Sequence, residues 1–193
     1  MGQGSTRDRI LDATAALYAD RGPSRTLHRD IAEHAGVSRP TVYKHVGDQE
    51  AIARALLDRE LDRFHAELRV VLDGAAGARE RFVDGLVFSV TYAREHPVLQ
   101  RVIADEPNLV LPLLTTRADP LLKETIGVVA PYLAEAIERG EIRQVDPEVI
   151  AEWLARMVLS MVITPGVTTR LDDRDELRRF VTELFTFGLD ADR

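Results

Sequence analysis

Side chains that donate hydrogen bonds or carry positive charge gather on one short stretch of this 193-residue chain. The stretch lies in the second half of a segment, residues 26–52, that reads TLHRDIAEHAGVSRPTVYKHVGDQEAI. Its donors are Arg39, Thr41, Tyr43, Lys44 and His45. Groups of this kind bind phosphates and the base edges in the major groove of DNA. Their close spacing predicts one short helix that offers them to a nucleic acid.

Two short helices, expected at about residues 27–35 and 39–46, must position these donors. Gly36 supplies the positive φ that ends the first helix. Ser38 caps the second helix, and Pro40 lies in its first turn, where a missing amide hydrogen costs little. The residues expected in the corner between the helices are Ile31, Ala35, Val37 and Val42. The pattern favours a DNA-binding helix-turn-helix over the alternative, an ordinary helical hairpin with a glycine in its turn.

Helical periodicity continues along most of the chain, and no period-2 strand pattern is found. The stretch between Pro107 and Pro120 predicts irregular chain or short turns, and Pro131 predicts a kink or break near Gly127. We therefore expect an all-α protein of about nine helices. A three-helix helix-turn-helix head, residues 1–47, is expected to precede a helical effector and dimerisation domain, residues 48–193.

Composition narrows the possible classes of protein. The chain has no cysteine, which excludes disulfides and thiolate metal sites. It shows no secretory signal and no apolar run near the ~18 residues that a membrane span needs, so we expect a cytoplasmic protein without membrane contact. The formal net charge is −7. Residues 1–47 carry a net +2 and the remainder −9, so the acidic excess lies outside the predicted head.

Catalytic and metal-binding patterns are absent from the sequence. The five histidines lack metal-ligand spacing, and there is no nucleophile motif, glycine-rich phosphate loop or pair of carboxylates. We therefore expect neither an enzyme nor a metal or cofactor. An all-α enzyme that uses a C-terminal cavity remains the alternative from another functional class.

The N-terminal segment resembles the tetracycline-repressor (TetR) family of transcriptional regulators over about residues 6–56. The family pattern is I-A-x-x-A-G-V-S-x-x-T-x-Y-x-H-F-x-x-K-E, with a threonine shortly before the isoleucine. The matching residues are Thr26, Ile31, Ala32, Ala35, Gly36, Val37, Ser38, Thr41, Tyr43, His45 and Glu50. Val46 and Gln49 depart from the pattern, and Gln49 replaces a lysine that usually meets a phosphate. Without the charge of that lysine, the salt dependence of DNA binding should be flatter by about one phosphate contact.

The resemblance implies a homodimer on a palindromic operator, with a regulatory C-terminal domain. It implies that Thr26 and Tyr43 contact phosphates and that Arg39, Thr41 and Lys44 lie near base edges. The complete predicted DNA-binding set is Thr26, Arg39, Pro40, Thr41, Tyr43, Lys44 and His45. On this interpretation the protein is a ligand-responsive regulator, a repressor that a small apolar effector releases from DNA.

The effector site and the dimer interface are predicted from apolar stripes in the C-terminal half. The predicted ligand-binding residues are Phe88, Tyr92, His96, Leu99, Leu113, Tyr132, Trp153, Arg156 and Met157. The predicted interface, on the last two helices, comprises Met161, Leu177, Phe180, Val181, Leu184 and Phe185. Such stripes also serve as plain core, and the periodicity does not separate core from interface. A fully packed C-terminal core would favour a constitutive DNA-binding protein, whereas a void of several hundred Å³ would favour a receptor.

Overall fold

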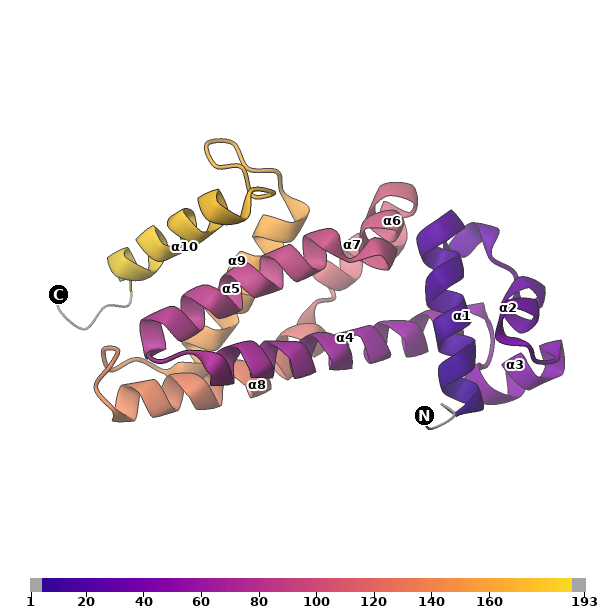
Figure 1. Ribbon diagram of the computed structural model, residues 1–193, viewed down its shortest axis with the longest axis horizontal. Coiled ribbons are helices and arrows are strands. Elements are labelled where there is room, and N and C mark those ends of the chain that lie inside the picture. The colour runs from indigo at the N-terminus through magenta and orange to yellow at the C-terminus, as the bar shows by residue number, and fades with distance from the viewer. Residues whose placement is uncertain (1–4, 189–193) are drawn as a thin grey trace. The chain divides into compact units, whose positions relative to one another are not determined.

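The computed structural model describes residues 5–188, without the side chains of Leu109 and residues 185–188. These residues form ten α-helices and one 3₁₀ turn, η1, and no β-strand (Figure 1). The elements are α1 (Thr6–Arg21), η1 (Pro23–Arg25), α2 (His28–Ala35), α3 (Arg39–Val46), α4 (Gln49–Gly74), α5 (Ala78–Glu95), α6 (Pro97–Asp105), α7 (Pro107–Leu114), α8 (Asp119–Glu138), α9 (Pro147–Ile163) and α10 (Arg174–Gly188). The predicted all-α class with an N-terminal helix-turn-helix is confirmed.

Local capping residues set several of the helix ends. Ser5 caps α1, since its hydroxyl accepts from the Asp8 amide at 3.2 Å while the Asp8 carboxylate accepts from the Ser5 amide at 3.0 Å. Gly22, with φ of 81°, ends the same helix. Asp146 caps α9 ahead of Pro147. These contacts satisfy amide groups that a helix terminus leaves without partners.

The first compact unit contains the described residues from 5 to 62 together with residues 96–111. Within it α1 packs against α2, α3 and α6. Its fully buried centre comprises Ile10, Leu11, Ile31, Val42 and Ile52. The three N-terminal helices therefore share their core with the start of α4 and with a segment that follows α5 in sequence.

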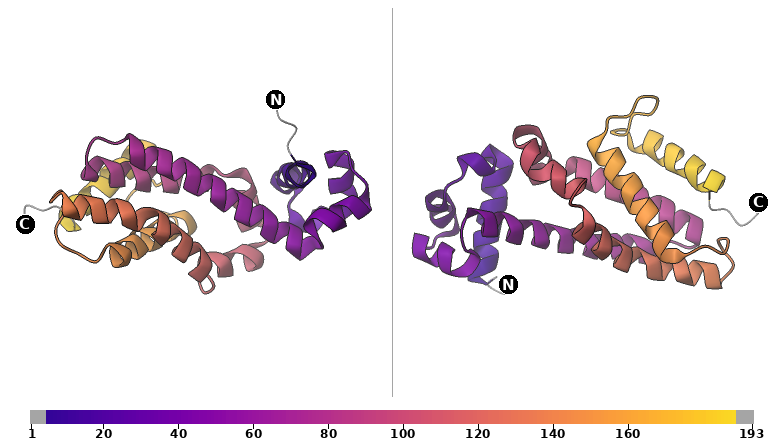
Figure 2. Two further views of the ribbon diagram at one scale, coloured as in Figure 1. Left: turned by 90° about the horizontal axis from the view of Figure 1, so that it is seen from below. Right: turned by 180° about the vertical axis from the view of Figure 1, so that it is seen from behind.

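The second compact unit contains residues 63–95 and the described residues from 112 onward. In this unit α8 packs against α9, and α5 packs against both α9 and α10 (Figure 2). The centre of its core comprises Leu72, Phe82, Val87, Val90, Leu133, Leu177 and Val181. The long helix α4 contributes residues to both units, so it is a covalent connection between them.

Of two predictions from proline positions, the irregular stretch after Pro107 was wrong, and the break that Pro131 allowed near Gly127 does not occur. The stretch after Pro107 forms α7, although Pro112 lies inside it, because Val110 and Leu114 are buried on either side. Helix α8 runs through Pro131 without a break, since Val128, Val129 and Leu133 hold both of its halves in the core. Burial of apolar side chains thus outweighs the loss of one backbone hydrogen bond at each proline.

None of the helices in the described part of the chain combines the length and the apolar character needed to cross a lipid bilayer.

Candidate nucleic-acid interface and effector site

Helix α3 separates a buried apolar face from an exposed polar one. Val42 and Val46 are buried in the core of the head. The exposed residues are Arg39, Pro40, Tyr43, Lys44 and His45, and Thr41 is half-buried. The Ser38 hydroxyl accepts from the Thr41 amide at 3.3 Å and so caps the helix as predicted. Six of the seven predicted DNA-binding residues therefore lie together on one helix.

The turn before α3 is fixed by backbone geometry and by a side chain from α1. Gly36 adopts the left-handed conformation with φ of 65°. The Arg9 guanidinium donates to the carbonyl oxygens of Ala35 at 3.0 Å and Gly36 at 3.4 Å. These carbonyls end α2 and lack partners within the helix. The sequence analysis missed Arg9, because no local sequence pattern indicates a contact between residues 26 positions apart.

Thr26, the seventh predicted DNA-binding residue, lies apart from the exposed group. Its side chain is 1% exposed, and its hydroxyl donates to the carbonyl of Gly22 at 2.8 Å. This bond closes the loop that contains η1. The expected contact between Thr26 and a phosphate is corrected, since the hydroxyl is buried and bonded to Gly22.

Gln49 points into the head. Its side-chain amide Nε2 lies 3.2 Å from the Tyr18 hydroxyl, 3.3 Å from the Pro23 carbonyl and 3.1 Å from the Thr26 carbonyl. One side chain at the start of α4 thus joins α1, η1 and the segment before α2. The residue that departs from the family pattern has a structural role here that the sequence analysis did not foresee.

Tyr18, which accepts from Gln49, is 2% exposed. Burial raises the pKa of the Tyr18 hydroxyl to about 12, and the negative charge of Glu106 adds to the rise. The Glu106 carboxylate, directly after α6, accepts from the Ser24 amide in η1 at 2.7 Å. The α1–α2 connection is therefore held from both α4 and the end of α6.

Two side chains lie against the ring of Tyr43. The imidazole of His28 is parallel to it, with ring centres 4.2 Å apart and an angle of 8° between the planes. The Arg39 guanidinium carbon is 5.7 Å from the ring centre. The sequence analysis did not include His28 among the functional residues.

Phe88 and Tyr92, from the predicted ligand set, belong to an aromatic cluster with Phe64. The ring centres of Phe64 and Phe88 lie 6.0 Å apart. The ring centre of Tyr92 lies 5.4 Å from each of these two. The neighbouring His65 is 5% exposed, and its Nε2 lies 3.1 Å from the Thr125 hydroxyl. The sequence analysis missed this buried polar pair beside an apolar cluster.

His96 and Leu99 belong to the first compact unit, whereas the other predicted ligand-binding residues belong to the second. His96 caps α6, because its Nδ1 accepts from the Leu99 amide at 3.2 Å, and its Nε2 lies 3.5 Å from a carboxylate oxygen of Glu60. Leu113 is half-buried in α7, within the second unit. His96 thus has a local structural role.

Tyr132 also has contacts of its own. Its hydroxyl donates to the Asp73 carboxylate at 2.8 Å, and the Arg81 guanidinium lies 5.6 Å from its ring centre. Burial and the bond to Asp73 raise the pKa of the Tyr132 hydroxyl. These contacts do not involve Phe88 or Tyr92, although Tyr132 and Phe88 pack against the same apolar core.

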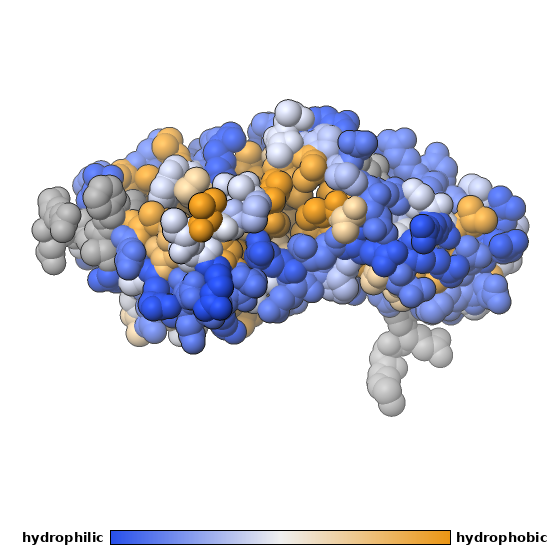
Figure 3. Space-filling view, turned by 90° about the horizontal axis from the view of Figure 1, so that it is seen from above, coloured by the Kyte–Doolittle hydropathy of each residue, from blue (hydrophilic) through white to orange (hydrophobic). Residues whose placement is uncertain are grey.

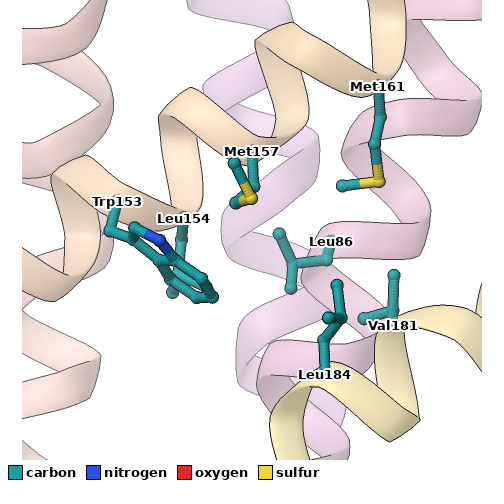
Figure 4. A pocket seen from close by; sticks show the side chains of 7 residues that line it. All are labelled: Leu86, Trp153, Leu154, Met157, Met161, Val181 and Leu184. Atoms are coloured by element: carbon teal, nitrogen blue, oxygen red, sulfur yellow. The ribbon is translucent and has the colours of Figure 1, made fainter. Parts of the chain in front are cut away.

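Trp153 and Met157 line an apolar hollow between α9, α5 and α10 (Figure 4). The side chains that point into it are Leu86, Trp153, Leu154, Met157, Met161, Val181 and Leu184. Its volume is only about 10 Å³. Arg156, on the same helix, is exposed and its guanidinium donates to Glu152 at 2.8 Å. Arg156 therefore does not line the hollow.

A second hollow, of about 140 Å³, lies beside the loop that follows α9 and includes Thr164 and Phe180 in its lining. Both volumes are below the several hundred Å³ expected of a formed receptor cavity. Neither of these two hollows is a formed receptor cavity.

Three of the six predicted interface residues lie in the core of a single subunit. Leu177 is fully buried, Val181 is 1% exposed and Met161 is 8% exposed, so they leave little surface for a partner. This corrects their assignment to an interface. Phe180 and Leu184 are half-buried, and the side chain of Phe185 lies outside the described residues.

The part of the chain that the structure describes contains no group of three or more histidine, aspartate or glutamate side chains placed to hold a metal ion.

Comparisons with known proteins match both halves of the chain. Residues 10–56 match the bacterial regulatory proteins of the tetR family. Residues 78–182 match the C-terminal domain of the bacterial tetracyclin repressor. The chain belongs to the TetR family.

Relatives of this TetR-family protein are similar over nearly its whole length. The uncharacterized HTH-type transcriptional regulator Rv1255c of Mycobacterium tuberculosis is 31% identical over 185 residues, which cover 93% of this chain and 85% of the relative. AlkX of the same organism is 27% identical over 179 residues, covering 91% and 83%. The crystal structure of the TetR family repressor AlkX from Dietzia sp. strain DQ12-45-1b, implicated in biodegradation of n-alkanes, is 26% identical, with a TM-score of 0.69 and coverage of 96% and 95%. This TetR-family protein is a DNA-binding transcriptional regulator.

The contacts of Gln49 predict that its replacement loosens the head. Gln49→Ala leaves the Pro23 and Thr26 carbonyls without their side-chain donor and should cost about 1–3 kcal/mol of unfolding free energy. Gln49→Glu should cost more, since a carboxylate facing two carbonyl oxygens can only accept. Thermal unfolding followed by circular dichroism measures both. Gln144→Ala, at an exposed loop position, is the control. An unchanged melting temperature for Gln49→Glu would contradict the structural role.

Proposed function

We propose that this regulator is a homodimeric repressor that binds a palindromic operator through α3 and leaves it when a small apolar effector binds. The observation that carries the proposal is the polar face of α3, with five exposed residues on a helix whose opposite face is anchored by Val42 and Val46. A short, donor-rich helix after a tight turn fits the major groove of DNA.

In this proposal, the side chains of α3 divide between base edges and phosphates. Arg39 and Lys44 reach the acceptors of guanine, and Thr41 lies beside them. Tyr43 and His45 contact phosphates, which fix the register of the helix on the duplex. Thr26 is left out of this set because its hydroxyl is buried and bonded to Gly22.

The charge distribution supports binding as a dimer. Each head has an excess of only two positive charges over residues 1–47, while the rest of the chain carries −9. A single head therefore gains little from non-specific attraction to phosphate. Two heads on half-sites about 34 Å apart double the specific contacts, and the acidic remainder opposes binding elsewhere.

The dimer contact is proposed on the exposed apolar surface of α9. Trp153 is 41% exposed and Val149 is 61% exposed, both on this helix. Leu184 of α10, half-buried, lines the apolar hollow beside Trp153. Hydrophobic residues gather on the C-terminal unit in the face shown in Figure 3. Large exposed side chains of this kind are typical of surfaces that bind another protein.

The effector site is proposed at the aromatic cluster of Phe64, Phe88 and Tyr92. Apolar rings beside the buried His65–Thr125 pair offer an apolar wall with one or two polar groups, the usual composition of a small-molecule site. The described role of Dietzia AlkX, implicated in biodegradation of n-alkanes, supports an effector of apolar character.

The small volume of the two hollows in the C-terminal unit favours a second candidate, a constitutive DNA-binding protein. The two hollows, of about 10 and 140 Å³, hold no drug-sized ligand. An effector must therefore open the aromatic cluster. By linkage, the state that binds effector more tightly then binds the operator more weakly.

The first prediction from the proposed function concerns α3. Lys44→Ala and Tyr43→Ala should each abolish the shifted band in a gel-shift assay, with a loss of about 10- to 100-fold per half-site. The duplex is one that the wild-type protein recovers from a random-sequence library. Lys123→Ala, the only other lysine, lies exposed on α8 and is the control. Full binding by both α3 variants, with unchanged melting temperatures, would refute the recognition-helix assignment.

The second prediction concerns the dimer. Trp153→Glu places a charge on the proposed interface and should weaken dimerisation at least about 30-fold. Sedimentation velocity across a concentration series measures the change. Val70→Glu alters an equally apolar residue, 72% exposed on α4, and should leave the oligomeric state unchanged. A Trp153→Glu protein with wild-type self-association would place the interface elsewhere.

The third prediction separates a ligand-responsive regulator from a constitutive one. Medium-chain alkanes and alkanols are tested as probes, by thermal shift and by release of the selected duplex. Ligands that bind only the folded protein raise its melting temperature, and reciprocal coupling requires the same compounds to weaken DNA binding. Phe88→Trp should fill the site and suppress both effects, while Tyr132→Phe should not. If no probe changes the melting temperature or the DNA binding, the constitutive protein is favoured.

A further inference from the structure

His28 is a buried polar side chain that the proposed DNA-binding set does not use. It is the first residue of α2 and is only 8% exposed. Its imidazole lies parallel to the ring of Tyr43 on α3, with ring centres 4.2 Å apart. The residue therefore covers one face of an aromatic side chain that remains 44% exposed.

A hydrogen bond fixes the imidazole in this place. Its Nε2 lies 3.1 Å from the carbonyl oxygen of Gly47. A carbonyl only accepts, so Nε2 carries the hydrogen. Gly47 ends α3 with φ of 85°, and its own amide donates to the Tyr43 carbonyl at 3.0 Å. His28 therefore holds the last turn of α3 through a ring contact and through a backbone bond.

We propose that His28 is a positioning residue for operator binding, which presents the Tyr43 hydroxyl to the DNA in a single orientation. The inference rests on the proposed function, in which Tyr43 contacts a phosphate. A half-exposed tyrosine samples several rotamers in the free protein, and DNA binding has to select one of them. The stacked His28, with the Arg39 guanidinium near the same ring, makes that selection before DNA arrives.

A positioning role differs from a purely structural one because its effect on DNA binding depends on the Tyr43 hydroxyl. A core residue would affect folding and would weaken DNA binding whatever stands at position 43. A positioning residue acts through the Tyr43 hydroxyl, so its effect disappears when that hydroxyl is absent.

The test is a double-mutant cycle on the duplex selected from a random-sequence library. His28→Leu removes the ring and the donor, His28→Gln removes only the ring, and His28→Phe keeps the ring without the donor. The Leu and Gln variants should bind about three- to tenfold more weakly per half-site, and the Phe variant should stay close to wild type. In a Tyr43→Phe background, His28→Leu or His28→Gln should change affinity by less than about twofold.

Proton NMR of the Tyr43 ring provides an independent readout. The parallel imidazole shifts these signals upfield in the wild type, so the shift should vanish in the Leu and Gln variants and persist in the Phe variant. His34→Leu removes an exposed histidine at the other end of α2 and is the matched control. Melting temperatures verify the fold, and the Gln variant, of similar length and with a donor, replaces His28→Leu if the latter is unstable.

Two results would overturn the inference. One is wild-type affinity in both the Leu and Gln variants. The other is an equal loss of affinity in the Tyr43 and Tyr43→Phe backgrounds, which would reduce His28 to a structural residue. Failure of the proposed function is distinguishable, because Lys44→Ala would then bind DNA as tightly as the wild type.

Discussion

Burial of two valines on α3 is the constraint on which the DNA-binding surface depends. An eight-residue helix is not stable in water by itself, because its few hydrogen bonds do not offset the cost of nucleation. Val42, fully buried, and Val46, 7% exposed, anchor it to the core that α1, α2 and the start of α4 build. The orientation of these valines decides which residues of α3 face outward. The polar face of the helix is a consequence of its apolar face.

Side-chain donors from three helices hold the connections of the head. Arg9 of α1 donates to the carbonyls at the end of α2, and His28 of α2 donates to the carbonyl of Gly47. Gln49 of α4 donates to the carbonyls of Pro23 and Thr26. Carbonyl groups at helix ends and in loops lie outside the regular backbone ladder, so side-chain donors of this kind help to satisfy them. Gln49 therefore connects the start of the helix that continues into the C-terminal unit with the loop before α2.

Sequence predicted the features that local chemistry decides and missed those that distant contacts decide. The cap at Ser38 follows from residue type and position, so it was predicted correctly, and the caps at Ser5 and Asp146 have the same local basis. Thr26 and Gln49 have surface-type side chains, yet partners 4 to 31 residues away draw them inward. In α7 and α8, burial overrides the proline rule. The His28–Tyr43 stack joins two helices, and no periodicity reports it.

The last helices illustrate why an apolar stripe alone does not separate core from interface. Neighbouring residues of α9, Leu154 and Trp153, are 5% and 41% exposed, although both are apolar. On α10 the stripe residues Leu177 and Val181 complete the core of one subunit. Trp153 lines the small apolar hollow on this side, so a partner bound there would close it. An effector that used the same hollow would compete with dimerisation, and hence with operator binding by two heads. In our proposal, an effector at the aromatic cluster of α4 and α5 would leave the dimer contact intact and would act through α4, the helix that contributes residues to both units.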